Sequence, residues 1–472
     1  MGSKLKTPMA HALYTNLDGK RILVAGAGVT GAACARALEK RGSTVTIVDE
    51  KVRSLESFSV ITPDAVSFSN FDLLLVSPGW REDHPVVLAA RAERIALINE
   101  VDLAWSLKPT GQKWIALTGT NGKTSTVELT AAMLRSGGFQ AVACGNVGTT
   151  VIETVDSIEK HDFLVLELSS FQLHWLEDAQ FVSSAILNIA QDHVDWHGSF
   201  DAYAKDKISI LDKSMTAVLN ADDGEIVNRT THWQGRKVFF SLDTPAPGEI
   251  GVVEELLVDR AFVADTQEAS MICELVEVTP TVPHNVSNTL AAAGLARTVG
   301  TSHEAIRAAI QEFSPGRHRI EKVGEKDGIA WINDSKATNP HAASASIMSA
   351  LSVIWVAGGL AKGASMSELV TRIKSRVRVA ILIGEDRELI AQELTEKASH
   401  IEIIRIDAPT DYVKGGASNS LMEEVVRAAH AKALSGDTVL LAPACASMDQ
   451  FISYGDRGDR FKDAVEKVVI NG

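Results

Sequence analysis

Several features that mark specialised protein classes are scarce in this chain of 472 residues. It has four cysteines, Cys34, Cys144, Cys273 and Cys445, and none of them belongs to a C-x-x-C pair. This spacing argues against a disulfide framework or a cysteine zinc site and is typical of a reducing compartment. No stretch approaches the ~18 uninterrupted apolar residues of a membrane-spanning helix. Residues 1–17 also lack the apolar segment of a signal peptide, so we expect a cytoplasmic protein without a membrane partner.

The chain has fewer basic than acidic residues. The chain has 46 Lys and Arg against 60 Asp and Glu, which gives a formal net charge of −14 at pH 7 and a pI near 5.4. This balance argues against a protein that coats nucleic acid. An anionic substrate would therefore need local positive charge or a metal ion. Hydrophobic residues make up 45% of the chain, as is ordinary for a globular protein with true cores.

Apolar strand patterns alternate with helical patterns along the whole chain, which predicts an α/β protein with mostly parallel sheets covered on both faces. The length allows roughly three domains. We predict a Rossmann-like domain over residues 1–108, a central P-loop ATPase-like domain over 109–316, and a C-terminal Rossmann-like domain over 317–472. The acidic stretch 242–282 is expected to be a peripheral hairpin or insertion.

The first glycine loop is Gly26-x-Gly28-x-x-Gly31, between a predicted strand and a predicted helix, and Asp49 ends the next strand. Such glycines let the backbone approach a pyrophosphate at a helix N-terminus. The pattern predicts either NAD or a nucleoside-diphosphate substrate, and a tight turn without ligand is the alternative. The domain is short for the two halves of a dinucleotide fold, which favours a mononucleotide such as a UDP compound.

The second glycine loop reads LTGTNGKT over residues 117–124. Leu117 stands where a P-loop normally has its first glycine. An apolar strand precedes the loop and a helix follows it, so the context still favours ATP. Backbone N–H groups around Gly119 and Gly122 can hold phosphates, Lys123 can reach the β and γ phosphates, and Thr124 can bind Mg²⁺.

Two further residues have metal-ligating chemistry. Glu167 ends the apolar strand FLVLE, where its hard carboxylate oxygens suit Mg²⁺. His193 follows Asp192 and is expected at the end of the next strand. A histidine in such a place is more often a structural hydrogen-bonding group than a ligand.

Several ordered segments together resemble the Mur ligases and their folylpolyglutamate synthetase relatives: TGTNGKT, CGNVG (144–148), LELSSFQL (166–173), LNIAQDHVD (187–195) and HNVSN (284–288). The segments NDSKATNP (333–340) and PACASMDQF (443–451) are similar to the branch of the family that uses D-glutamate. One departure is GGLAKG (358–363), where the family more usually has a Gly-Gly-Asp-Lys-like segment.

The resemblance implies an ATP-dependent amide ligase of peptidoglycan precursor synthesis. ATP would phosphorylate the carboxylate of UDP-N-acetylmuramoyl-L-alanine, and the amine of D-glutamate would then attack the acyl phosphate. The first domain would hold the UDP substrate, the central domain ATP, and the C-terminal domain D-glutamate and part of ATP. Two Mg²⁺ ions and a monomeric protein are implied as well.

The resemblance also assigns roles to individual positions. The ATP site would comprise Gly119, Thr120, Asn121, Gly122, Lys123, Thr124, Asn285, Asn288, Arg319 and Asp334. The UDP substrate would contact Gly28, Thr30, Asp49, Lys51, Ser77 and Asn146. D-Glutamate would contact Lys336, Thr338, Lys362, Ser447 and Tyr454. The metal ligands would be Thr124, Glu167, His193 and Lys207. For Asn285, Asn288, Arg319, Asp334 and the five D-glutamate positions, spacing alone favours a solvated residue at the end of a loop.

Catalytic roles fall to Lys123, His193 and Lys207. The family places a lysine converted to its carbamate at the position of Lys207, whose new oxygens would help to hold metal. The alternative is a solvated lysine on the predicted helix 200–211, with Lys205 and Lys213 as equal neighbours.

Three other functions stay open at the level of sequence. A folylpolyglutamate-type ligase would not need the loop from Gly26 to Gly31 ahead of its P-loop domain. A NAD-dependent oxidoreductase would rest on that loop and Asp49. A nucleotide-gated regulatory module without turnover would not need the carboxylate, histidine and lysine set.

Overall fold

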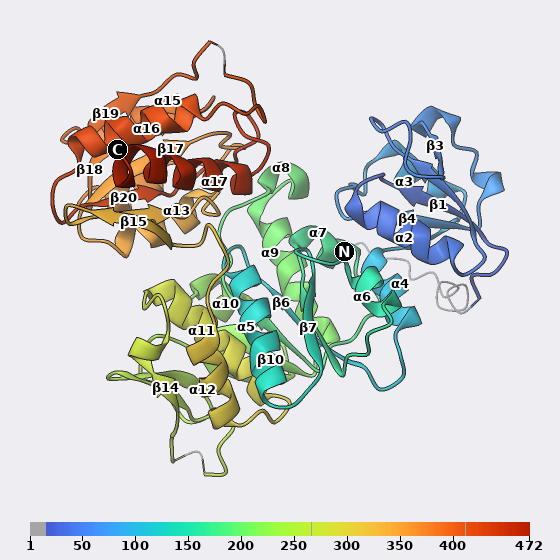
Figure 1. Ribbon diagram of the computed structural model, residues 1–472. Helices are drawn as coiled ribbons and strands as arrows, with labels where there is room; N and C mark the ends of the chain where they lie inside the picture. Colours follow the sequence, from blue (N-terminus) through green and yellow to red (C-terminus); the bar gives the residue numbers. More distant parts are fainter. Residues whose placement is uncertain (1–15, 266, 411) are drawn as a thin grey trace. The chain divides into compact units, whose positions relative to one another are not determined.

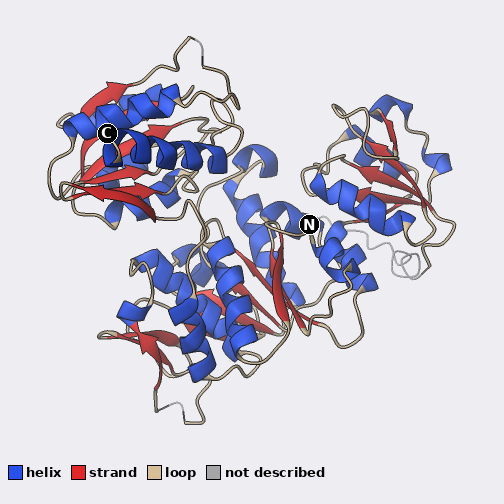
Figure 2. Ribbon diagram, in the orientation of Figure 1, coloured by secondary structure: helices blue, strands red, loops and turns tan. Residues whose placement is uncertain are grey.

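The computed structural model describes residues 16–265, 267–410 and 412–472. It contains three separate β-sheets, of five, nine and six strands (Figure 1). Helices in blue flank red strands in each of them (Figure 2). The α/β class predicted from the sequence is therefore confirmed. No helix in the described ranges is long and apolar enough to cross a membrane.

The first sheet has the strand order β3-β2-β1-β4-β5, and all its pairs are parallel. Its strands are β1 (Arg21–Ala25), β2 (Thr44–Val48), β3 (Ser59–Ile61), β4 (Leu73–Val76) and β5 (Ala96–Ile98), and the helices of this stretch are α2 (Val29–Glu39), α3 (Pro85–Ala92) and α4 (Glu100–Leu107). Strands β1 and β4 are almost entirely buried, because helices cover both faces of a parallel sheet. The order of connections reverses between β1 and β4, which makes that crevice the expected ligand site of such a sheet.

The second sheet has the order β14-β13-β12-β11-β10-β9-β6-β8-β7. Its strands are β6 (Lys113–Thr118), β7 (Ala141–Gly145), β8 (Phe163–Glu167), β9 (Ser183–Ile186), β10 (Thr216–Asn220), β11 (Arg236–Phe240), β12 (Ile250–Val253), β13 (Leu256–Asp259) and β14 (Ser270–Glu274). The helices of this part of the chain are α5 (Lys123–Ser136), α6 (Val151–Asp156), α7 (Ser170–Trp175), α8 (Val194–His197), α9 (Phe200–Ile208), α10 (Gly224–Thr230), α11 (Pro283–Arg297) and α12 (His303–Glu312).

The acidic stretch 242–282 agrees with the peripheral hairpin or insertion expected for it, because β12 and β13 form an antiparallel hairpin near the edge of the central sheet. Strand β12 pairs in parallel with β11 through Phe240 and Ile250, and β13 and β14 follow in antiparallel register. The stretch thus extends the central sheet at one edge. Its hydrophobic side chains Ile250, Leu257 and Ile272 are buried.

The third sheet has the order β15-β16-β20-β17-β18-β19, with only the β15–β16 pair antiparallel. Its strands are β15 (Glu321–Lys326), β16 (Ile329–Asn333), β17 (Val353–Gly358), β18 (Val377–Ile383), β19 (Glu402–Arg405) and β20 (Thr438–Leu441), and its helices are α13 (Pro340–Met348), α14 (Ser367–Ile373), α15 (Arg387–Lys397), α16 (Ser420–Lys432) and α17 (Tyr454–Val465).

Strand β17 shows how the third sheet is buried on both faces. Val353 and Trp355 belong to one hydrophobic core, whereas the alternating residues Ile354 and Val356 belong to the other. Successive side chains of a strand point to opposite faces, so two apolar layers form on one sheet. The loops at the carboxyl ends of the strands are left to carry polar groups.

Candidate active site

The first glycine loop lies at the crevice between β1 and β4. Gly26 has φ +102°, a left-handed conformation that favours glycine, and Gly28 is the N-cap of α2 without a side-chain cap. Ser77 follows β4 and lies close to Gly26. A side chain at Gly26 would place its Cβ atom 3.1 Å from Ser77 Oγ. This Oγ is buried and has no hydrogen-bond partner among the described residues. Three positions expected to contact the UDP group thus lie at the carboxyl ends of β1 and β4: Gly28 at the N-cap of α2, Thr30 in its first turn and Ser77 after β4.

The carboxylate of Asp49 stabilises its own loop. It accepts hydrogen bonds from the backbone N–H groups of Ala27 (2.9 Å), Lys51 (2.8 Å) and Val52 (2.8 Å). Burial acts to raise the pKa of Asp49, but these bonds together outweigh it and lower that pKa. Asp49 therefore joins the glycine loop to the loop after β2, and the side chain of Lys51 is exposed at the surface.

The second glycine loop connects β6 to α5. Gly122 has φ +82°, and a Cβ atom there would lie 2.3 Å from Oδ1 of Asn288 on α11. Lys123 Nζ donates to the carbonyl oxygens of Gly119 and Thr120, both at 2.9 Å. These contacts bring Lys123 and Asn288, both expected at ATP, to the same loop.

Asn188, in the segment that follows β9, holds this loop in place. Its Oδ1 accepts from the Asn121 N–H at 2.8 Å, its Nδ2 donates to the Asn121 carbonyl at 3.1 Å, and its own carbonyl accepts from the Thr120 N–H at 3.0 Å. The expected ATP residue Thr124 is buried at the start of α5. Asn285, by contrast, donates from Nδ2 to the Pro280 carbonyl at 2.9 Å.

Lys207 is buried at the end of α9, with 2% of its surface exposed. Its Nζ donates to the Gly119 carbonyl at 2.8 Å and lies 3.3 Å from Thr118 Oγ1. It also lies 4.8 Å from the ring centroid of Tyr203, whose hydroxyl is 2.8 Å from Thr120 Oγ1. The alternative of a solvated lysine is wrong for Lys207, whereas Lys205 two residues earlier is exposed.

Glu167 ends β8 as expected and is 1% exposed. Its Oε1 accepts from Asn146 Nδ2 at 3.0 Å, and its Oε2 is buried without a hydrogen-bond partner among the described residues. An unsatisfied carboxylate oxygen in a buried place is costly unless a ligand satisfies it. Because hard oxygen donors are what Mg²⁺ prefers, Glu167 and the buried hydroxyl of Thr124 fit that ion. Asn146 orients the carboxylate.

Asp334 follows β16 directly and is buried. It accepts from the Ile320 N–H at 3.4 Å and from Ser346 Oγ. Burial raises the pKa of Asp334 to about 6, although these hydrogen bonds and the positive charge of Arg319 oppose that rise. Asp334 and Arg319, expected together at the nucleotide, therefore interact electrostatically.

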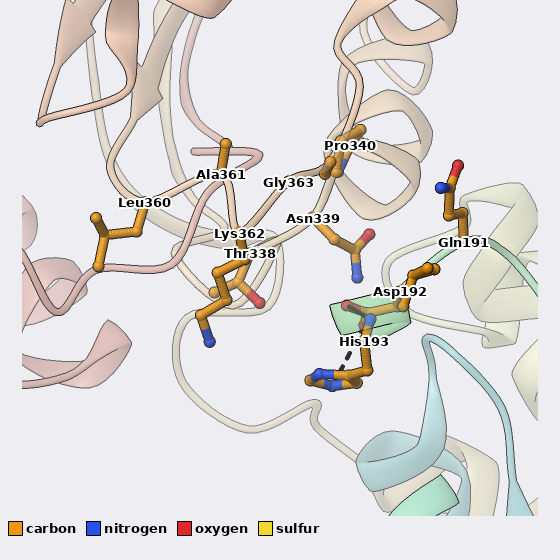
Figure 3. A pocket seen from close by; sticks show the side chains of 12 residues that line it. Gln191, Asp192, His193, Thr338, Asn339, Pro340, Leu360, Ala361, Lys362 and Gly363 are labelled. Atoms are coloured by element: carbon orange, nitrogen blue, oxygen red, sulfur yellow. Dashed lines mark hydrogen bonds and ion pairs between the residues drawn. The ribbon is translucent and has the colours of Figure 1, made fainter. Parts of the chain in front are cut away.

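A pocket brings together three positions expected to act on the amine and on metal. His193, Thr338 and Lys362 line it, together with Gln191, Asp192, Val194, Asn339, Pro340, Leu360, Ala361, Gly363 and Ala364. Figure 3 shows the Asn339 side chain extending from its loop toward the segment with Asp192 and His193. His193 was expected at a strand end, but β9 ends at Ile186, and His193 instead precedes α8 with φ +51°.

The other residues expected at D-glutamate lie outside the lining of this pocket. Lys336 Nζ is 4.1 Å from the ring centroid of Tyr454, so these two are neighbours. Ser447 is 3% exposed, in the loop after β20. Because Lys336 precedes Thr338 by two residues, its loop is shared with the pocket.

Arg457 on α17 joins the three loops that carry these groups. It is completely buried, and it donates to Ser335 Oγ at 2.9 Å and the Ser335 carbonyl at 3.0 Å, to the Gly358 carbonyl at 3.4 Å and to the Cys445 carbonyl at 3.2 Å. Burial lowers the pKa of Arg457 to about 10, so the side chain is still charged at neutral pH. The five N–H donors of a guanidinium suit such a junction.

Asp386 braces the loop of Lys362. Its carboxylate accepts from the Ala361 N–H at 2.7 Å, and its own N–H donates to the Gly359 carbonyl at 3.0 Å. Lys362 itself has φ +51°. Sequence reasoning missed Asn188, Tyr203, Asp386 and Arg457. Only the first had a signal, since it lies inside the quoted segment LNIAQDHVD.

Two family models match the chain. The Mur ligase middle domain matches residues 117–296, and the Mur ligase glutamate ligase domain matches residues 318–445. The chain belongs to the Mur ligase family. This is a family of ATP-dependent ligases, which agrees with the loop between β6 and α5.

Relatives that match almost the whole chain carry one name. UDP-N-acetylmuramoylalanine–D-glutamate ligase of Thermobifida fusca is 45% identical over 471 residues, covering 96% of this chain and 99% of its own. The ligases of the same name from Streptomyces avermitilis and Mycolicibacterium smegmatis are 43% and 41% identical, with 96% of this chain covered in both cases and 99% and 97% of their own.

Solved structures agree at the level of fold. The MurF ligase of Thermotoga maritima, crystallised in complex with ADP, aligns with a TM-score of 0.58 at 15% identity and covers 97% of both chains. UDP-N-acetylmuramate-alanine ligase MurC of the same organism aligns with a TM-score of 0.56 at 18% identity, covering 95% of this chain and 99% of its own. The three-sheet architecture is thus the one found in Mur ligases.

Proposed function

We propose that this chain joins D-glutamate to UDP-N-acetylmuramoyl-L-alanine at the expense of ATP, in cytoplasmic peptidoglycan precursor synthesis. The observation that carries the proposal is the full-length similarity to ligases of that name, at up to 45% identity over 96% of the chain. The cluster of Lys123, Glu167 and Lys207 around the second glycine loop supplies the chemistry. We propose that the protein acts as a monomer.

The reaction must overcome repulsion between anions, because a carboxylate attacks a triphosphate. A carboxylate oxygen of the acyl substrate forms a bond to the γ-phosphorus, and the bond from that phosphorus to the β–γ bridging oxygen breaks to release ADP. The Lys123 ammonium neutralises charge on the phosphoryl group as it moves. Lys123 is held for this task by the Gly119 and Thr120 carbonyls.

The second step forms the amide. The D-glutamate amine attacks the carbonyl carbon of the acyl phosphate, loses a proton, and phosphate leaves with the electron pair of the broken C–O bond. Lys336, Thr338, Lys362, Ser447 and Tyr454 supply the cations and hydroxyl groups that the two carboxylates of D-glutamate need. The pocket lined by Thr338 and Lys362 supports this role.

The other site assignments are part of the same proposal. Gly28, Thr30, Asp49, Lys51 and Ser77 hold the UDP group, with Asn146 near the acyl part. Asn285, Asn288, Arg319 and Asp334 contact the adenosine part of ATP. The proposed domain limits are 1–108, 109–316 and 317–472.

Two Mg²⁺ ions belong to the proposal, with Thr124 and Glu167 as ligands of one, and with His193 and a carbamate of Lys207 at the other. Bound Mg²⁺ screens the charge of the phosphates. The carbamate fits the surroundings of Lys207, because its nitrogen keeps one N–H that can still donate to Gly119. Its two new oxygens turn a buried cation into an anionic ligand.

The deciding experiment measures phosphate release from ATP with UDP-N-acetylmuramoyl-L-alanine, with and without an amino acid. D-Glutamate should drive turnover, whereas L-glutamate, L-alanine and a diamino acid should not, because poorer fits leave buried polar groups unpaired. Equal turnover with L-glutamate would overturn the assignment of Lys336, Thr338, Lys362 and Ser447. Absence of turnover with every amino acid would overturn the function.

A further inference from the structure

Two hydrogen-bond donors converge on Gly26 in the crevice between β1 and β4. A Cβ atom at Gly26 would lie 3.0 Å from Trp80 Nε1 and 3.1 Å from Ser77 Oγ, so both atoms approach the same point of the glycine loop. Neither Nε1 of Trp80 nor Oγ of Ser77 has a hydrogen-bond acceptor among the described residues. An indole N–H can only donate, so its partner must be an acceptor.

Two hydrogen bonds hold the backbone of Trp80, and its ring packs against His84 and the hydrophobic core of the first sheet. Its backbone N–H donates to the Ser77 carbonyl at 3.1 Å, and its carbonyl accepts from Trp175 Nε1 at 3.1 Å. Its ring centroid lies 4.1 Å from that of His84. The indole is therefore preorganised, and binding costs little side-chain entropy.

The surroundings of the two donors suit an anion. The crevice is the point where the strand order reverses, and such a point binds ligands at the carboxyl ends of the strands. Helix α2 begins here after the uncapped Gly28, so its first N–H groups and its positive end face the loop. Both carboxylate oxygens of the nearby Asp49 are already occupied by backbone N–H groups.

We propose that the indole N–H of Trp80 donates a hydrogen bond to the diphosphate of the nucleotide substrate, beside the hydroxyl of Ser77. The inference rests on the proposed function, in which this domain holds a UDP compound. It adds a specificity-determining residue: Trp80 reads the phosphate chain and not the base. Hydrogen bonds to charged acceptors are roughly twice as strong as neutral ones, so the loss of this bond is measurable.

The test is calorimetric binding of UDP-N-acetylmuramoyl-L-alanine, UDP and uridine to the full-length protein and to Trp80→Phe. Phenylalanine keeps an aromatic ring against His84 and removes the N–H donor together with one ring of the indole. We expect the affinity for the first two ligands to fall on the order of 10-fold, and that for uridine to change less than about 2-fold. Trp105→Phe, the same substitution on α4, should change none of the three.

Several outcomes would overturn the inference. An equal loss for uridine and UDP would assign Trp80 to the base or to the shape of the loop, and unchanged binding of UDP would leave it no role. If Trp80→Phe does not fold, Ser77→Ala carries the test, because loss of the second donor should likewise weaken UDP and spare uridine. Failure of the wild-type protein to bind the UDP substrate would instead contradict the proposed function.

Discussion

Glu100 is a carboxyl group placed where ionisation is unfavourable. It lies at the start of α4, is 1% exposed, and accepts from the Ile152 N–H at 3.1 Å. Burial raises the pKa of Glu100 to about 7, and the backbone hydrogen bonds only partly oppose this. The folded protein therefore holds this proton more tightly than the unfolded chain does. Stability linked to Glu100 is greatest at low pH and falls as the pH rises from about 4.5 to 7.

Glu100→Gln should remove this pH-dependent penalty. The amide oxygen can still accept from Ile152, but it never ionises, so the variant should be more stable at pH 8 by at most about 3 kcal/mol. The gain should shrink toward pH 5, where the wild-type carboxyl is protonated in the folded state. Melting temperatures at the two pH values measure this, with Glu39→Gln at an exposed position as the control. A gain that is equal at both pH values would contradict the prediction.

Lys207→Ala should reduce turnover by roughly 10²-fold or more, because the proposed carbamate preorganises the metal site. Lys205→Ala is the matched control on the same helix and should change little, since that side chain is exposed. Steady-state rates of phosphate release compare the two variants. A ¹³C signal for a carbamate after incubation with labelled bicarbonate would be an independent readout. Near-normal turnover of Lys207→Ala would sink the carbamate proposal.

At the scale of single residues, the sequence could predict which functional groups take part in the site, but not which atoms of the fold surround them. The sequence alone does not distinguish Lys207 from its neighbours Lys205 and Lys213. The fold does, because it places Lys207 Nζ against the Gly119 carbonyl. Glu167 could be predicted because an acidic residue that ends an apolar strand is a local pattern. Tyr203 and Arg457 could not, since their partners are 83 and 122 positions away along the chain.

The conformation of a loop is fixed when residues of other elements form hydrogen bonds to it. The loop of Lys362 is braced by Asp386, which joins it through both its N–H and its carboxylate. Lys362 adopts a left-handed φ, a conformation that costs of order 1–3 kcal/mol and persists only where neighbours enforce it. Asp386 is thus a positioning residue for Lys362.

Asp386→Ala should raise the KM for D-glutamate about 10-fold through a displaced Lys362, with a smaller change in the KM for the UDP substrate. Asp386→Asn keeps an oxygen that can accept from Ala361 and should recover most of this loss. Asp407→Ala removes a surface carboxylate that pairs with Arg387 and should have no effect on either constant. A uniform loss in both KM values would indicate general damage instead.

At the scale of elements, the strand–helix alternation was readable because short apolar runs ended at turn residues. The stretch 242–282 could be predicted as a peripheral hairpin but not as part of the central sheet, because a single pair of residues, Phe240 and Ile250, joins β12 to β11. His193 was misplaced for a related reason. The segment from Leu187 to Asp192 continues an apolar and polar alternation, so the sequence suggests a longer strand, but β9 ends at Ile186.

For the whole molecule, the proposed ATP contacts are shared between two compact units. The phosphate loop is in one of them, whereas Arg319 and Asp334 are in the other, and the chain enters the second unit for the last time at Ser314. A ligand that contacts both units favours the arrangement in which both contacts are made. We expect movement about residues 314–319.

Small-angle scattering should therefore report compaction when an ATP analogue and UDP-N-acetylmuramoyl-L-alanine are added together. Lys123→Ala, which lacks the ammonium for the phosphates, should show less compaction at the same ligand concentrations. An unchanged radius of gyration for the wild-type protein at saturation would contradict closure.

The four thiols offer a way to follow such motion directly. All four are buried, and burial raises the pKa of Cys34 well above its usual value and those of Cys144, Cys273 and Cys445 to about 12. Only the thiolate reacts readily with maleimides. These side chains are therefore unreactive for two reasons: a reagent cannot reach them, and their thiol groups stay protonated. A pair of cysteines introduced on the surface, one in each unit, can thus carry donor and acceptor dyes with every native thiol left in place.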